Sequence, residues 1–272
     1  MRLAVLGDPI AHSLSPAIHA AFLAAADIPG TYTARRVDAS GMVEAIAEVR
    51  GGMLDGANVT MPHKQLASRL ADRVSPLAAR TGAVNTWTRI GGEVAGHNTD
   101  VVGFLAAWKA AGLPDEAPVL LLGAGGAAAA AAVALDGKRL VVSARHPDRA
   151  AEMLRLVRVP AETAPWGEPV PGAVVVNATP VGRHGEELAD AVLAEASGLL
   201  DMAYGRAATP AVAGARARGI PVADGATMLV AQAAESFRLW TGRIAAIDAA
   251  MAAVERALGG DETRSTPPPP SS

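Results

Sequence analysis

Short apolar runs alternate with alanine-rich stretches along most of the chain, and this alternation predicts an α/β protein with parallel strands. Up to residue 100, the pattern predicts strands over residues 3–6, 31–37 and 56–59 and helices over residues 16–26, 40–49 and 63–72. A second series of strands is predicted over residues 119–122, 140–143, 174–177 and 199–201, with helices between them. That spacing is typical of a doubly wound nucleotide-binding sheet.

The pattern changes near Gly225 to two long helical stretches, predicted over residues 228–240 and 244–258. The segment from Gly259, which ends in TPPPPSS, cannot bury an apolar core and is expected to be disordered. The uncharged stretch from Val119 to Leu135 consists mostly of alanine and glycine, whose weak apolarity argues against a membrane span.

Composition narrows the kinds of partner that the chain can bind. The net charge is −3, and acidic and basic residues are interspersed, so no basic field would attract nucleic acid or an anionic membrane. The chain has no cysteine, which excludes disulfides and thiolate metal sites and fits a reducing compartment. Since the apolar run before Asp8 is too short for a signal peptide, we expect a cytoplasmic protein that binds small molecules.

A glycine-rich turn follows the strand predicted at 119–122, in the sequence VLLLGAGGAAAA. Gly123 would allow the tight turn, Gly125 would let the backbone approach a pyrophosphate, and the next helix would offer its first N–H groups to the phosphates. Ala128 takes the third fingerprint position, where a small residue permits close helix–strand packing. The flanking strand and helix favour a dinucleotide site over a turn that binds no ligand.

The end of the next predicted strand indicates which dinucleotide binds. About twenty residues after the glycines, where an NAD enzyme carries an acidic residue for the ribose, this chain has Arg145 and His146. A guanidinium suits a 2′-phosphate, so NADP is favoured over NAD, and a solvated loop arginine is the alternative. Asp148 is better explained as a capping or first-turn residue of the following helix.

Polar residues collect at the ends of predicted strands in the first half of the chain. Ser15 precedes Pro16 and suits the N-cap of the first helix, whereas Ser13 has no such structural explanation. Asn58 and Thr60 lie on one side of a strand end by period-two alternation. Hydroxyl and amide groups of this kind suit a polyhydroxylated substrate.

Lys64 and Asp100 are the candidates for proton transfer. Lys64 follows Pro62 in the predicted first turn of a helix, a position that usually favours acidic side chains, so it is either solvated or functional. Asp100 stands where a strand ends and a helix starts, and helix capping would also explain it. If the two side chains meet, they form an acid/base pair.

Seven segments of the chain resemble the shikimate dehydrogenase family and occur in the order of that family. They are GDPIAHSLSP, NVTMPHK, GAVNT, HNTD, GAGGAA, NATPVG and MLVAQAAESFRLWTG. One such match could arise by chance, but seven in order could not. The resemblance implies NADP-dependent, reversible reduction of 3-dehydroshikimate to shikimate, a step of chorismate and aromatic amino-acid biosynthesis.

The resemblance also implies two α/β domains. Residues 1–101, completed by helices within 226–258, would form the substrate-binding domain, and residues 102–225 would form a Rossmann-type, doubly wound NADP-binding domain. Residues 259–272 would remain as a proline-rich tail. Lys64 would be the catalytic acid/base, paired with Asp100, and would stabilise and protonate the oxygen on which negative charge develops.

Individual ligand roles follow from the same resemblance. The side chains expected to hold shikimate are Ser13, Ser15, Thr60, Asn85, Asp100, Tyr204 and Gln232. The residues expected to bind NADP are Gly123, Ala124, Gly125, Gly126, Ala127, Arg145, His146 and Arg149, with Met202 and Gly225 at the nicotinamide end. His63 and His97 lack metal-ligand spacing, so no catalytic metal is expected.

Two positions depart from the family pattern. Only the arginine of the usual Asn-Arg-Thr cofactor signature is present, in Ala144-Arg145-His146, and Thr227 stands where the family commonly has glycine. A quinate or aminoshikimate dehydrogenase, and a non-catalytic NADP-binding sensor on the same fold, are alternatives. The sequence leaves open whether the amphipathic C-terminal helices cover their own core or form a homodimer.

Overall fold

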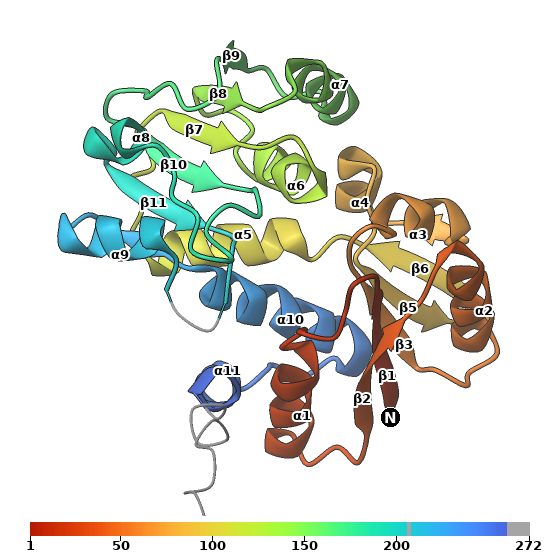
Figure 1. Cartoon of the computed structure of the whole chain (residues 1–272). Helices are drawn as coiled ribbons and strands as arrows, with labels where there is room; N and C mark the ends of the chain where they lie inside the picture. The colour runs from red at the N-terminus through yellow and green to blue at the C-terminus, as the bar shows by residue number, and fades with distance from the viewer. Residues whose placement is uncertain (206–207, 260–272) are drawn as a thin grey trace, which may run out of the picture.

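The computed structural model describes residues 1–205 and 208–259, which build two six-stranded sheets in separate lobes (Figure 1). In the N-terminal lobe the strand order is β2-β1-β3-β5-β6-β4. The strands are β1 (Arg2–Gly7), β2 (Thr31–Arg36), β3 (Gly56–Val59), β4 (Arg73–Val74), β5 (Thr86–Ile90) and β6 (Glu93–His97). The helices are α1 (Ser15–Ala25), α2 (Ala39–Arg50), α3 (Lys64–Leu70) and α4 (Pro76–Thr81).

The second sheet is parallel throughout, with the order β12-β11-β10-β7-β8-β9. Its strands are β7 (Val119–Leu122), β8 (Leu140–Ser143), β9 (Glu162–Ala164), β10 (Val174–Asn177), β11 (Gly198–Asp201) and β12 (Val222–Ala223). Its helices are α6 (Gly126–Ala134), α7 (Pro147–Val157), α8 (Asp190–Ala194) and α9 (Pro210–Ala217). Every residue of β7, β8, β10 and β11 is buried, as expected for a parallel sheet covered by helices on both faces.

Helix α5 (Asp100–Ala110) leads from the first lobe to the second and packs against both α6 and α10 (Gly225–Thr241) (Figure 1). A methyl group added to Gly103 would lie 2.6 Å from Cβ of Gln232, so only glycine permits this close contact between α5 and α10. Helices α10 and α11 (Ile247–Gly259) return to the first lobe, where they pack on α1 around a core that includes Phe22 and Phe237.

The α/β fold class predicted from the sequence is confirmed, and the seven predicted strands are all present. The expectation of parallel strands alone is wrong for β5 and β6, which form an antiparallel hairpin across Gly91 and Gly92. Both glycines have positive φ, the backbone conformation that tight hairpin turns require. None of the helices in the described ranges has the length and hydrophobicity needed to cross a membrane.

The domain boundaries at 101/102 and 225/226 stay a prediction. Both fall at the start of a helix, close to Asp100 in α5 and at Gly225 in α10. Residues 260–272, which belong to the predicted tail, lie outside the described residues.

Candidate active site

Lys64 is the first residue of α3, and its side chain reaches Asp100 at the start of α5. The Lys64 Nζ lies 2.5 Å from Asp100 Oδ2, and the side chains are 21% and 11% exposed. Because water is largely excluded, the attraction between these charges is stronger than in a surface ion pair. Lys64 lies in the first turn of a helix, as predicted. Pro62 lies in the turn before this helix and not in its first helical turn, so the prediction for Pro62 was wrong.

The carboxylate of Asp100 does not cap its own helix. Instead, Asn98 Oδ1 accepts hydrogen bonds from the backbone N–H groups of Asp100, at 3.1 Å, and of Val101, at 3.4 Å. These are N–H groups that a helix start leaves without intrahelical partners. Since Asn98 satisfies them, both oxygens of Asp100 are available to side chains: Oδ2 to Lys64 and Oδ1 to the Asn85 amide, at 2.9 Å.

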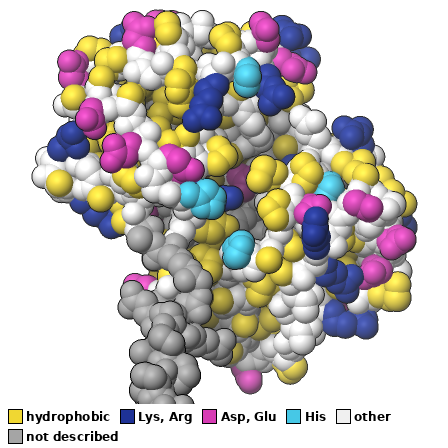
Figure 2. All heavy atoms as spheres, viewed as in Figure 1, with side chains coloured by type: hydrophobic (Ala, Val, Ile, Leu, Met, Phe, Trp, Pro, Cys, Tyr) yellow, Lys and Arg dark blue, Asp and Glu magenta, His cyan; other side chains and the backbone are white. Residues whose placement is uncertain are grey.

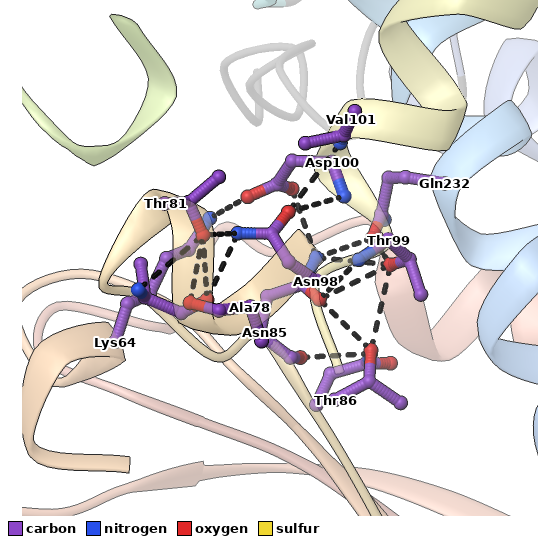
Figure 3. Close-up of polar contacts among 12 residues, drawn as sticks. Lys64, Ala78, Thr81, Asn85, Thr86, Asn98, Thr99, Asp100, Val101 and Gln232 are labelled. Atoms are coloured by element: carbon purple, nitrogen blue, oxygen red, sulfur yellow. Dashed lines mark hydrogen bonds and ion pairs between the residues drawn. The ribbon is translucent and has the colours of Figure 1, made fainter. Parts of the chain in front are cut away.

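Asn85, which directly precedes β5, is the centre of the polar cluster beside the ion pair (Figure 3). Its Nδ2 also donates to Thr99 Oγ1 at 2.9 Å, and its Oδ1 accepts from the Thr99 backbone N–H at 2.8 Å. Gln232 of α10 completes the cluster, because its Oε1 accepts from Thr99 Oγ1 at 3.2 Å. The structure thus brings four predicted site residues together: Lys64, Asn85, Asp100 and Gln232 (Figure 3).

The polar network continues behind these residues through side chains that were not on the predicted site list. Asn58 Nδ2 lies 2.9 Å from both Thr86 Oγ1 and Ser236 Oγ, and Ser236 Oγ lies 3.2 Å from Thr99 Oγ1. Asn58 Oδ1 accepts from the Tyr32 hydroxyl at 2.6 Å. The spacing of Gln232 and Ser236, one helical turn apart, was the available signal that α10 presents two polar groups to this network.

Ser13 lies in the loop after β1, Thr60 in the loop after β3, and Ser15 is the first residue of α1. Ser15 is already helical and makes no side-chain cap, so its predicted N-cap role was wrong. Ser13 Oγ accepts the Ser15 backbone N–H at 3.3 Å instead, since it lies two residues upstream. Burial raises the pKa of Tyr32 well above its usual value, and the neighbouring Ser15 hydroxyl opposes that rise.

The glycine turn of the second lobe faces the ion pair of the first. A methyl group added to Gly126 would lie 3.9 Å from Cδ of Lys64. The surface is hollowed between the two lobes in the space-filling view (Figure 2). The candidate acid/base group and the start of α6 therefore lie close to each other.

A cavity of about 540 Å³ opens beside this glycine turn. Gly123 has a φ of +117°, and a methyl group there would lie 3.0 Å from the Ala178 carbonyl oxygen, so the turn requires glycine. Gly125 has open space around it and immediately precedes α6, so its backbone can approach a ligand. Thr179 and Pro180, from the loop after β10, line the same cavity.

Three predicted cofactor residues with cationic or ionisable side chains surround the far end of the cavity: Arg145, His146 and Arg149. All three side chains are exposed. Asp148 lies in the first turn of α7, as predicted, and points to no ligand role. Trp166, which was not among the predicted cofactor residues, also lines the cavity.

Met202 and Gly225, predicted at the nicotinamide end, are neighbours. A methyl group on Gly225 would lie 3.0 Å from the Met202 carbonyl oxygen and 2.6 Å from that of Ala203. Burial raises the pKa of Tyr204, and the Arg183 guanidinium lies 5.8 Å from the centre of its ring. The described contacts place Tyr204 against Arg183 rather than in the hydrogen-bonded cluster of Asn85.

Two family models match the chain in agreement with this geometry. The shikimate dehydrogenase substrate binding domain matches residues 5–87, and the shikimate 5′-dehydrogenase C-terminal domain matches residues 225–255. A shikimate dehydrogenase (NADP(+)) of Thermus thermophilus is 41% identical over 267 residues, covering 95% of this chain and 99% of the relative. The chain belongs to the shikimate dehydrogenase family.

Further shikimate dehydrogenases agree with this assignment. The relative from Acidiphilium cryptum is 39% identical over 260 residues and covers 92% of this chain and 94% of the relative. A crystal structure of a Thermus thermophilus shikimate 5-dehydrogenase in complex with NADP(H) and shikimate has a TM-score of 0.86 and 37% identity, covering 94% of this chain and 99% of the other. The family predicted from the seven sequence segments is confirmed.

Proposed function

We propose that this chain is an NADP-dependent shikimate dehydrogenase in which Lys64 is the acid/base and Asp100 holds it in place. The observation that carries the proposal is the largely buried ion pair of Lys64 and Asp100, which lies beside the glycine turn of the second lobe. A binding protein would not need a shielded proton donor next to the cofactor turn. The activity is that of the relatives, and the roles of individual residues are our proposal.

The residues of the first lobe suit a ring that carries hydroxyls and a carboxylate. Asn85, Asp100 and Gln232 supply amide and carboxylate groups for hydroxyls, and Thr60 lies in the loop that leads to Lys64. Ser13 and Ser15, which follow β1, supply hydroxyls. Neutral donors of this kind hold a carboxylate without the rigid fork that an arginine would impose.

Lys64 would act on the oxygen of the reacting carbon. During reduction of the ketone, negative charge develops on that oxygen, and the Lys64 ammonium stabilises it and then donates a proton. In the reverse direction the neutral amine accepts the hydroxyl proton. Asp100 keeps Nζ in position through the contact of 2.5 Å, and Asn85 in turn fixes the carboxylate.

The second lobe fits NADP. The glycine turn at Gly123 and Gly125 admits a pyrophosphate against the start of α6, because side chains there would fill the space or strain the turn. Arg145, His146 and Arg149 line the same cavity and would hold the 2′-phosphate. When bound, NADPH supplies the hydride. Gly126, Ala124 and Ala127 would line the pyrophosphate, and Met202 and Gly225 the nicotinamide.

The first test of this function is the initial rate of shikimate oxidation with NADP and, separately, with NAD. We expect turnover that strongly favours NADP, because no acidic residue stands where NAD enzymes bind the ribose. Turnover that favours NAD would keep the enzyme class and overturn the role of Arg145. Turnover of quinate equal to that of shikimate would overturn the substrate assignment.

We extend the proposal to the organisation of the protein. Residues 1–101 with 226–258 would bind the substrate, and residues 102–225 would bind NADP, which places Lys64 and the glycine turn in different domains. We propose a cytoplasmic location, where a chain without cysteine suits the reducing conditions. A homodimer is the oligomer that we would test for first, by light scattering.

A further inference from the structure

Trp166 stands at the corner of a tightly held turn. The backbone N–H of Glu168 donates to the Pro165 carbonyl at 3.2 Å, which closes a four-residue turn with Trp166 and Gly167 in its middle. Gly167 has a φ of +81°, the conformation that the third position of such a turn requires. The tryptophan is therefore displayed by a closed turn rather than by an open loop.

The turn is tied to the strand that carries the cofactor arginine. Ser143, the last residue of β8, is fully buried, and its Oγ donates to the Pro165 carbonyl at 2.8 Å. β8 and β9 also pair in parallel, with Ser143 opposite Ala164. Arg145 lies two residues after Ser143, and Trp166 lies two residues after Ala164. The two side chains therefore follow the ends of neighbouring strands.

The guanidinium of Arg145 lies against the indole of Trp166. Its Cζ is 5.3 Å from the centre of the ring, within the range of a cation–π contact. Both side chains line the cavity of about 540 Å³ beside the glycine turn. Trp166 is 38% exposed, so part of its ring is accessible to a ligand in this cavity.

We propose that Trp166 is a specificity-determining residue that positions the Arg145 guanidinium for the 2′-phosphate of the cofactor. An exposed arginine loses side-chain freedom when it binds a phosphate, and this loss weakens binding. A flat ring against the guanidinium restricts it beforehand, so less freedom is lost when the phosphate arrives. Because NAD lacks this phosphate, the gain applies to NADP alone. The inference rests on the proposed function of Arg145.

The test uses two nucleotides that differ only in the 2′-phosphate, adenosine 2′,5′-bisphosphate and 5′-AMP, titrated by calorimetry into the full-length protein. Trp166→Leu should raise the dissociation constant of the bisphosphate about two- to five-fold and leave that of 5′-AMP unchanged. Trp166→Phe keeps an aromatic face and should restore most of the affinity. In an Arg145→Ala background, Trp166→Leu should have no further effect, because the group on which it acts is gone.

Several results would overturn the inference. Equal losses for the two nucleotides would mean that Trp166 contacts the adenine or supports the loop in general. An undiminished loss in the Arg145→Ala background would mean that it does not act through Arg145. Equal affinity of the unmodified protein for both nucleotides would overturn the role of Arg145 as well, whereas absence of shikimate turnover would overturn only the substrate assignment.

Discussion

The two candidate binding regions are built in opposite ways. In the substrate region, Asn85, Thr99 and Asp100 are buried and already bonded to one another through their side chains. In the cofactor region, Arg145, His146 and Arg149 extend from an open cavity and are exposed. The polar groups of the first region bond mainly to one another, whereas the cationic groups of the second line an open cavity.

The difference follows from what each region must recognise. Hydroxyl groups are distinguished only when donors and acceptors are placed within a few tenths of an ångström, so the side chains that meet them have to be fixed. A phosphate carries charge that acts over a longer range and tolerates different cationic partners. This explains why the cofactor loop can lose two residues of the family signature while the substrate segments keep theirs.

The largest effect is expected at the ion pair of the fixed region. Lys64→Ala should lower kcat about 10²- to 10⁴-fold, because a positioned proton donor is removed, while shikimate still binds. Steady-state kinetics and calorimetry with shikimate measure the two quantities. Lys109→Ala, which removes an exposed lysine of α5, serves as the control. Unchanged turnover of the Lys64 variant would eliminate Lys64 as the acid/base.

The next largest effect is expected at the open cavity. Arg145→Ala should raise the KM for NADP about 10- to 100-fold, as expected for loss of a charged hydrogen bond, and should barely change the KM for shikimate. Arg155→Ala, at an exposed arginine of the following helix α7, should change neither value. If the KM for shikimate rises as much as the KM for NADP, Arg145 does not act on the cofactor region alone.

Two buried groups, one in each lobe, should respond to acid in opposite directions. Burial lowers the pKa of His19, in the first lobe, to about 3, and the neighbouring Asn58 opposes the drop. Both ring nitrogens are buried without a hydrogen-bond partner among the described residues, and the ring stacks on Tyr32. In the second lobe, burial raises the pKa of Asp201, against the hydrogen bonds from Thr209, Ala203 and Asn177.

These shifts have opposite signs for stability. Between pH 6.5 and 3 the unfolded chain binds a proton at His19 that the folded chain does not, so stability falls as the pH falls through that window. Asp201 stabilises the fold at low pH, and its contribution is lost as the pH rises through its folded pKa. Of these two groups, His19 is therefore the one through which acid weakens the fold.

His19→Phe isolates the first of these contributions. The unmodified protein should lose about 2 kcal/mol through His19 between pH 7 and pH 5, and the variant should lack that loss. Urea unfolding at the two pH values measures the difference, and His12→Gln, at an exposed histidine, is the matched control. An unchanged pH difference in the Phe variant would show that folding does not lower the pKa of His19.

The smallest effect is expected behind the substrate site. Ser236→Ala removes hydrogen bonds to Asn58 and Thr99 and should lower kcat/KM for shikimate about five-fold, with no change in the KM for NADP. Ser197→Ala, which removes a hydroxyl bonded to the Gly172 carbonyl in the second lobe, is the control. If Ser236→Ala also raises the KM for NADP about five-fold, the hydrogen-bond network is not confined to the substrate region.

The sequence predicted seven strands, three of the first sheet and four of the second, because apolar runs bounded by glycine and proline have few alternatives. It did not predict the β5–β6 hairpin, since the pattern was interpreted as parallel throughout although Gly91 and Gly92 marked a turn. Ser15 was assigned to an N-cap that lies one residue earlier, because helix ends shift by a residue without changing the pattern.

The sequence predicted the site residues that belong to recognisable motifs and missed those that only the fold brings together. Lys64 and Asp100 were identified as a pair because the family segments contain both, and the structure places them in contact. Asn58, Ser236 and Tyr32 form their network across three distant parts of the chain, and no local pattern links them. Trp166 was not among the predicted cofactor residues, because its contact with Arg145 depends on how β8 and β9 pair.

The glycine contact between α5 and α10 has a mechanical consequence. Asp100 begins α5, Gln232 lies in α10, and at Gly103 the two helices touch too closely to slide past each other. The same α5 packs on α6, the helix that starts at the glycine turn. The helix pair therefore holds Asp100 and Gln232 at one spacing and connects both to the helix that begins at the glycine turn.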